Sequence, residues 1–181
     1  MERSVTLNKN WGWFLLYGIA LVILGVIAIS AATLTTVISV IFIGSLLLIA
    51  GFILLIDTFV SWRHKAGGFI VHLIISLLYL IAGFMLIKTP VVGAASLTLI
   101  MAIFYIIVGL FRILDASIFK LPNYGWRIFS GIIALVLGII IIANWPAASL
   151  YIIGLFVGIE LLFIGWTYII LSIAAKDQPR L

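Results

Sequence analysis

The sequence predicts an all-α fold, a polytopic transmembrane bundle of six helices arranged as three repeated helical hairpins. Three observations predict it. The 181 residues are 66% hydrophobic and only 8% charged. Six long apolar runs follow one another, and small residues recur within them at matching positions. A water-soluble domain is about half apolar and a quarter charged, so the soluble, disordered and nucleic-acid-binding classes are excluded.

Each apolar run is long enough to cross a bilayer as a helix, since a hydrocarbon core about 30 Å thick needs roughly 20 helical residues. Transmembrane strands would alternate apolar and polar residues, whereas these runs are apolar throughout. The first run also resembles a signal peptide, but it is longer than the usual apolar region and shares the repeat of later spans. The predicted spans are Trp13–Ala31, Leu34–Val60, Phe69–Ile87, Val91–Ile118, Trp126–Ala143 and Ala148–Ala174.

Lysine and arginine are distributed unevenly between the two sides of these spans. One side carries Arg3, Lys9, Arg63, Lys65, Lys120, Arg127, Lys176 and Arg180. The other side carries Lys88. Because cytoplasmic loops hold the excess of basic residues, both termini are predicted to be cytoplasmic. The net charge of +5 then reflects topology, so the expected partner is the lipid bilayer and not nucleic acid.

The chain is predicted to form a single transmembrane domain, 1–181, built from three hairpins. Tight connections at 32–33, 89–90 and 144–146 pair the spans as approximately 11–62, 66–118 and 124–175. All three hairpins start and end on the same side, so the repeat is parallel, unlike the inverted repeats common in secondary transporters. The first span of each hairpin carries two small residues seven apart, and a further glycine marks the second span. These residues are Gly18, Gly25 and Gly51, then Ser76, Gly83 and Gly109, then Gly131, Gly138 and Gly165.

The spacing of these small residues predicts close helix packing. Positions seven apart lie on one helix face, and small side chains let helices approach each other. Gly154 and Gly158 form a small-xxx-small motif in the last span. This motif packs either within the chain or against a second copy in a homo-oligomer. The predicted packing positions are Gly18, Gly25, Gly83, Gly131, Gly138, Gly154 and Gly158.

Few ionisable residues fall within the spans, so each is a candidate for function. Glu160 lies near the middle of the last span, where a charged carboxylate is costly. It is either a protonatable switch or relay, or a structural polar contact between helices. Arg112 lies in the fourth span. Its side chain pairs with Glu160, reaches the headgroups, or pairs with Asp115 on the same helix.

Asp57 and Asp115 lie near the predicted cytoplasmic ends of their spans, where a negative charge opposes the helix dipole. Each is expected to be hydrated or to pair with a nearby cation, such as Arg63, Lys65, Lys120 or Arg127. The sequence has no phosphate-binding loop, metal motif or nucleophile with its base. The absence of cysteine excludes disulfides and thiolate sites. We therefore predict no catalytic residue, metal or cofactor, and no enzyme.

Several segments together resemble the HdeD family of bacterial acid-resistance membrane proteins, and the resemblance covers nearly the whole chain. Val157–Phe163, which surrounds Glu160, is similar to the family's last-span motif. Val108–Leu114, which contains Arg112, is similar to its fourth-span segment, and Gly125–Gly138 resembles the entry to its fifth span. The resemblance implies a six-span protein of the bacterial inner membrane associated with survival in acid. It implies no enzymatic activity or cofactor, and it assigns any carried-over role to Arg112 and Glu160.

Two functions of different classes are therefore carried forward. The first is a non-enzymatic stress protein whose bundle changes state when Glu160 is protonated or loses its pairing with Arg112. The second is a small channel or transporter for protons, ions or a solute, with polar residues lining a path. The polar residues that could line such a path are Thr98, Tyr105, Arg112, Asp115, Ser149, Tyr151 and Glu160.

Overall fold

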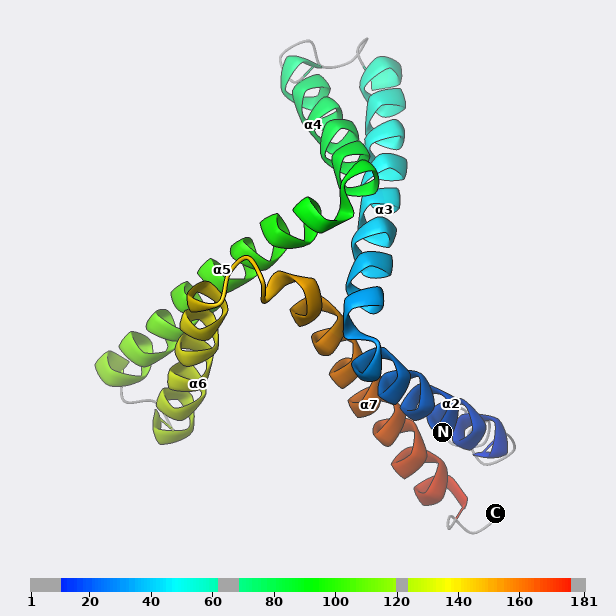
Figure 1. Ribbon diagram of the computed structural model, residues 1–181, viewed down its shortest axis with the longest axis vertical. Coiled ribbons are helices and arrows are strands. Elements are labelled where there is room, and N and C mark those ends of the chain that lie inside the picture. The colour runs from blue at the N-terminus through cyan, green and yellow to red at the C-terminus, as the bar shows by residue number, and fades with distance from the viewer. Residues whose placement is uncertain (1–10, 62–68, 120–123, 177–181) are drawn as a thin grey trace. The chain divides into compact units, whose positions relative to one another are not determined.

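The computed structural model describes residues 11–61, 69–119 and 124–176, and these residues form six helices without strands. Each helix is long and apolar enough to cross a membrane, so the chain is a multi-pass membrane protein. The predicted all-α fold and its six spans are confirmed, with ends that agree to within a few residues. The helices are α2 (Trp11–Ser30), α3 (Ala32–Ser61), α4 (Phe69–Lys88), α5 (Pro90–Phe119), α6 (Tyr124–Ala143) and α7 (Ser149–Lys176) (Figure 1).

The helices alternate between two lengths. Helices α2, α4 and α6 have 20 residues each, whereas α3 and α5 have 30 and α7 has 28. A 20-residue helix is about 30 Å long and matches the hydrocarbon core, while a 30-residue helix is about 45 Å long. The longer helices must therefore tilt or extend into the headgroup region.

Three short connections join α2 to α3, α4 to α5 and α6 to α7. Ala31 and Thr89 are each the single residue between two helices. The amide of each donates to a carbonyl four residues earlier, Ile27 and Met85, at 2.9 and 3.0 Å. Pro90 begins α5, a position where its missing N–H leaves no bond unmade. The third connection is longer, with residues 144–148 between the two helices, and it contains a cis Trp145–Pro146 bond.

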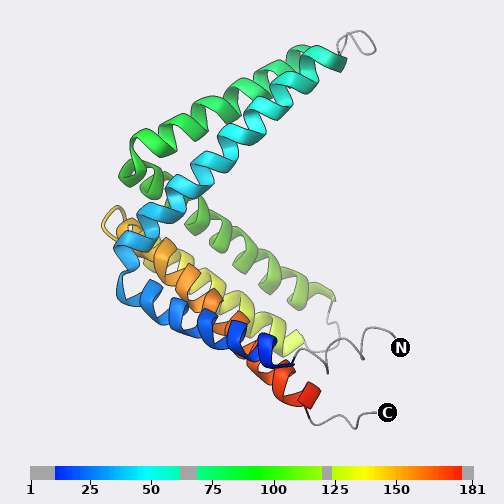
Figure 2. The same cartoon turned by 90° about the vertical axis from the view of Figure 1, so that its right-hand side faces the viewer.

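The chain divides into two compact units. Residues 1–36 and 151–181 form the first, and residues 37–150 form the second. In the first unit, α2 and α7 run side by side (Figures 1 and 2). A Cβ atom added at Gly18 would lie 2.9 Å from the Gly165 carbonyl oxygen, and one added at Gly25 would lie 2.9 Å from the Gly158 carbonyl oxygen. The two backbones thus approach each other so closely that only glycine fits.

The second unit contains two more pairs with the same contacts, α3 with α4 and α5 with α6. A Cβ atom at Gly83 would lie 2.7 Å from the Gly44 carbonyl oxygen. One at Gly131 would lie 2.9 Å from that of Gly109, and one at Gly138 would lie 2.8 Å from that of Ala102. Each 20-residue helix therefore packs through its small-residue face against a long helix.

Each small-residue face packs on a helix other than the one to which a tight connection joins it. The face of α4 packs on the preceding α3, that of α6 on the preceding α5, and that of α2 on α7. The predicted hairpins are pairs of consecutive helices joined by a tight connection. The closest backbone contacts lie instead between helices that no tight connection joins. We call the end of each pair away from the tight connections its open end.

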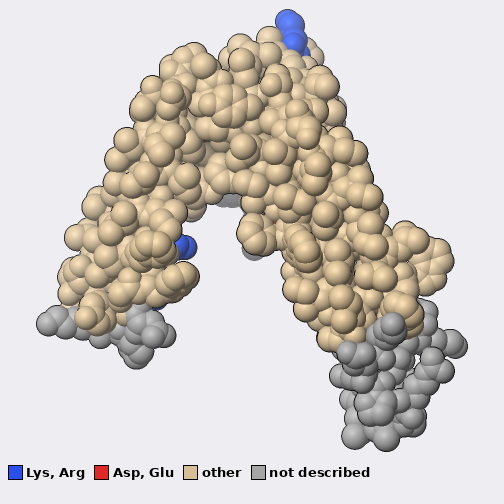
Figure 3. Space-filling model, turned by 60° about the horizontal axis from the view of Figure 1, so that its bottom comes forward, with Lys and Arg blue, Asp and Glu red and all other residues tan. Residues whose placement is uncertain are grey.

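The outward surface of the described residues is apolar. Small residues fill the contacts between helices, for example Ala94 and Ala102, which are 1% and 0% exposed. Large side chains point outward instead, and Phe42, Ile100 and Phe163 are each more than 60% exposed. On the face drawn in Figure 3, almost all side chains are neither acidic nor basic. Such a surface requires lipid, because in water it would drive aggregation.

Candidate functional site

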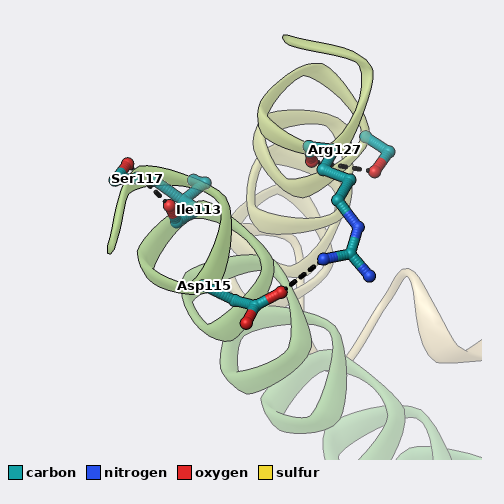
Figure 4. Close-up of polar contacts among 5 residues, drawn as sticks. Ile113, Asp115, Ser117 and Arg127 are labelled. Carbon is teal, nitrogen blue, oxygen red and sulfur yellow. Dashed lines mark hydrogen bonds and ion pairs between the residues drawn. The ribbon is translucent and has the colours of Figure 1, made fainter. Parts of the chain in front are cut away.

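An ion pair links α5 and α6 near the open end of their pair. The Nη1 atom of Arg127 on α6 donates to Oδ2 of Asp115 on α5 at 2.6 Å (Figure 4). The side chains are 47% and 34% exposed. Close packing of Gly109 against Gly131 brings the two helices near enough for this contact. Arg127 was one of the predicted candidate partners of Asp115.

Arg112 belongs to the same group of side chains. Its Nη1 atom lies 3.5 Å from the Ser130 hydroxyl on α6, and that hydroxyl donates to the Arg127 carbonyl oxygen at 2.9 Å. Arg112 is exposed, and its Cβ borders the contact at Gly131. Of the alternatives for Arg112, pairing with Asp115 on its own helix is not what the structure shows, since the Asp115 carboxylate binds Arg127. We call Arg112, Asp115, Arg127 and Ser130 the arginine cluster.

Glu160 lies on an exposed face of α7, eleven residues from the start of the helix, or about 16 Å along its axis. The equivalent positions in the other long helices are Leu46 on α3 and Phe104 on α5, which are 50% and 65% exposed. One repeat thus has a carboxylate where the other two have large apolar side chains. The pairing of Glu160 with Arg112 joins residues of different units and stays a prediction.

Asp57 lies on an exposed part of α3 near the open end of its pair with α4. It occupies the position that Asp115 holds on α5. Two of its predicted cationic partners, Arg63 and Lys65, lie outside the described residues, as does Lys120. Across the described residues, no group of three histidine, aspartate and glutamate side chains could hold a metal ion.

Gly154 and Gly158 contact the first unit's own helices. The backbone N–H of Gly154 donates to the Thr36 hydroxyl at 2.9 Å, and Gly154 also lies directly against the Ala32 carbonyl. Gly158 lies against Gly25. A homo-oligomer stays a prediction, and it would use another face of the chain or compete with these contacts.

Two further features were not found by sequence reasoning. Tyr168 on α7 stacks with Phe14 at 6.3 Å between ring centroids and meets Tyr17 edge-on at 5.1 Å. The signal was present in the repeat, because these aromatic residues occupy the positions of the arginine cluster in another helix pair. Thr98, at 0% exposure, has the one buried side-chain oxygen in the described part of the chain without a hydrogen-bond partner.

The sequence pattern of a family described as a short repeat of unknown function (DUF308) matches residues 16–88 and 80–143. The chain belongs to this family. The two DUF308 matches overlap within α4, as expected for a chain built from repeats. The second match includes the arginine cluster, whereas Glu160 lies beyond both.

The chain is also similar to Protein HdeD of Escherichia coli strain K12, of E. coli O157:H7 and of Shigella flexneri. Each is 23% identical over 122 residues, which cover 67% of this chain and 64% of the relative. The similarity therefore spans just under two thirds of these relatives. No solved structure matches the chain significantly. These relatives support the resemblance that the motifs around Arg112 indicated.

Proposed function

We propose that this chain is a non-enzymatic protein of the bacterial inner membrane that supports survival in acid, and that Glu160 acts as its protonation switch. The similarity to Protein HdeD and the six apolar helices support the coarser part of this proposal. The observation that carries the finer part is the exposed carboxylate of Glu160 within a transmembrane helix, at a position where the other repeats have Leu46 and Phe104.

The energetic difference between the two forms of this carboxylate gives the switch its basis. A charged side chain at the centre of a transmembrane helix costs about 2.5–3.5 kcal/mol on insertion scales, and more on an isolated helix. Protonation removes that charge. Any arrangement of the bundle that shields the ionised carboxylate is therefore favoured at neutral pH and loses its advantage in acid. An ion pair with Arg112 is the shielding that we propose.

Acid survival of a strain that lacks this protein tests the proposal. Wild type and Glu160→Gln would be supplied at matched membrane abundance, with Glu160→Asp as the control that keeps a carboxylate. We expect wild type and Glu160→Asp to protect and Glu160→Gln to lose protection. Equal protection by all three would contradict a switch at Glu160. Failure of wild type to protect would contradict the acid-resistance role itself.

A flux assay in proteoliposomes separates this proposal from a channel or transporter. We expect no proton or ion flux above that of protein-free vesicles between neutral and acid pH. Flux that disappears in Glu160→Gln would support transport instead. The positions of the polar residues on α5 favour the absence of flux, because Thr98 is buried while Arg112 is exposed. They do not form one continuous open stripe.

A further inference from the structure

The open ends of the three helix pairs share one backbone arrangement but carry different side chains. In the pair of α5 and α6 the equivalent positions hold the arginine cluster. In the pair of α7 and α2 they hold three aromatic residues and a leucine. In the pair of α3 and α4 they hold two apolar residues, one aspartate and one histidine. The counterparts of Arg112, Asp115, Arg127 and Ser130, in that order, are Tyr168, Leu171, Phe14 and Tyr17 in the pair of α7 and α2. In the pair of α3 and α4 they are Leu54, Asp57, His72 and Ile75.

The arginine cluster carries one more positive than negative charge. It has two guanidinium groups and one carboxylate, and both arginines are exposed. A guanidinium has five N–H donors. One terminal nitrogen of Arg127 binds Asp115, and the other points away from that carboxylate (Figure 4). Arg112 contacts Ser130 through one nitrogen at a long 3.5 Å. Donors therefore remain on both arginines for an anion.

The depth of the cluster matches the lipid headgroups. Arg112 lies seven residues before the end of α5, about 10 Å along the helix, and Arg127 lies three residues after the start of α6, about 5 Å. A long arginine side chain spans such distances while its stem stays in apolar surroundings. Large exposed apolar residues surround the cluster on the same two helices. They are Phe111, Leu114, Ile118, Trp126 and Phe129, at 72%, 49%, 69%, 71% and 53% exposure.

We propose that the arginine cluster binds the phosphate group of an anionic phospholipid. The guanidinium groups of Arg112 and Arg127 donate to the phosphate oxygens, a geometry that arginine forms well. The acyl chains lie along the exposed apolar side chains of α5 and α6. Ser130 holds Arg112 toward α6, and Asp115 competes with the phosphate for Arg127. Basic groups between transmembrane helices bind anionic headgroups in this way. The proposal stands without the switch at Glu160, and the phosphate and the Glu160 carboxylate would compete for the Arg112 guanidinium.

Lipid titration of the purified, delipidated protein tests this site, with bound lipid counted by native mass spectrometry. The probes are phosphatidylglycerol and phosphatidylcholine with the same acyl chains. We expect wild type to bind phosphatidylglycerol about tenfold more tightly, and this preference to shrink as salt is added. Arg112→Leu introduces the residue type that the equivalent position of α3, Leu54, carries, and it is expected to lose most of the preference. Equal binding of the two lipids by wild type would overturn the proposal.

Two further variants separate the site from general charge effects. Lys88→Gln also removes one exposed cation, but Lys88 ends α4 next to the tight connection, away from the open ends of the helix pairs. This variant is expected to keep the preference. Asp115→Asn removes the competing carboxylate and is expected to strengthen phosphatidylglycerol binding several-fold, a gain that misfolding cannot produce. A loss in Lys88→Gln as large as in Arg112→Leu, or weaker binding by Asp115→Asn, would contradict the site. Displacement of the lipid by millimolar inorganic phosphate would assign it to free phosphate instead.

Discussion

At the scale of single residues, Gly83 shows how little space separates the paired helices. A Cβ atom there would lie 2.7 Å from the Gly44 carbonyl oxygen and 2.8 Å from the Leu48 nitrogen. Both atoms belong to the backbone of α3, so neither can turn aside as a side chain would. In contrast, a Cβ atom at Gly125 would meet nothing within 4 Å. The same residue type is therefore required at one position and replaceable at another.

Replacing Gly83 with alanine is expected to destabilise the fold by about 1–3 kcal/mol, the usual cost of overpacking a well-packed contact. The matched control, Gly125→Ala, is expected to leave stability unchanged or raise it by up to about 1 kcal/mol, because alanine favours the helix. Unfolding followed by circular dichroism in detergent micelles measures both. A Gly83→Ala variant as stable as Gly125→Ala would show that the two backbones are not in contact.

The residues of the candidate site were predictable to different degrees. Sequence spacing near the helix ends was enough to name Arg127 as a candidate partner of Asp115. It could not identify Ser130 as a contact of Arg112, because a contact between two helices depends on their register and rotation. The same reason explains the aromatic contact of Phe14 with Tyr168, which lie at opposite ends of the chain. Residue types indicate which side chains need partners, while packing decides which partners they find.

At the scale of helices, α2 and α7 repeat the packing of the other two pairs without a loop that joins them. The residues after α3 and α5 connect each of these helices directly to its packing partner. The first and last helices are instead brought together by side-chain and backbone contacts, including the Ser172 hydroxyl, which donates to the Trp11 carbonyl oxygen at 2.6 Å. This pair is therefore the one that a second copy of the chain could exchange.

Cysteine cross-linking tests whether α2 packs on α7 of its own chain. The natural sequence has no cysteine, so Tyr17→Cys with Tyr168→Cys gives a chain with two thiols. The rings of these tyrosines are in contact, with centroids 5.1 Å apart, so a short bismaleimide is expected to link the two thiols within one chain, giving one bound reagent per monomer by mass spectrometry. The control combines Tyr17→Cys with Trp166→Cys, at an exposed position of α7, and is expected to bind two reagents per monomer. A cross-linked dimer in the first variant would indicate exchange between copies.

Hydropathy predicted the existence and order of the helices well, because lipid forces every backbone polar group to bond within its own helix. Hydropathy does not indicate which helices pack most closely. The positions of Gly18 and Gly25 marked a packing face but left its partner open. The partner is α7, since a single-residue connection turns the chain without aligning the small-residue faces of the two helices it joins.

At the scale of the whole molecule, one helix arrangement occurs three times with three sets of side chains. Repetition keeps the small residues that hold each pair, such as Gly25, Gly83 and Gly138. It leaves the surrounding positions free to differ, as Glu160 differs from Leu46 and Phe104. The functional residues of this family member are therefore best sought where the three repeats disagree, since the positions where all three carry small residues serve packing.

The six spans of the described residues, an even number, require Trp11 and Lys176 to lie on the same side of the membrane. The excess of Lys and Arg before α2, after α3 and α5, and after α7 predicts that this side is cytoplasmic. A green fluorescent protein fused after Leu181 is then expected to fluoresce, and alkaline phosphatase at that position is expected to be inactive. As the control, alkaline phosphatase fused after Asn144, in the connection between α6 and α7, should be active because it lies on the opposite side. Activity at Leu181 with inactivity at Asn144 would invert the topology. It would also place the arginine cluster near the outer headgroups, where its phosphate partner would then be found.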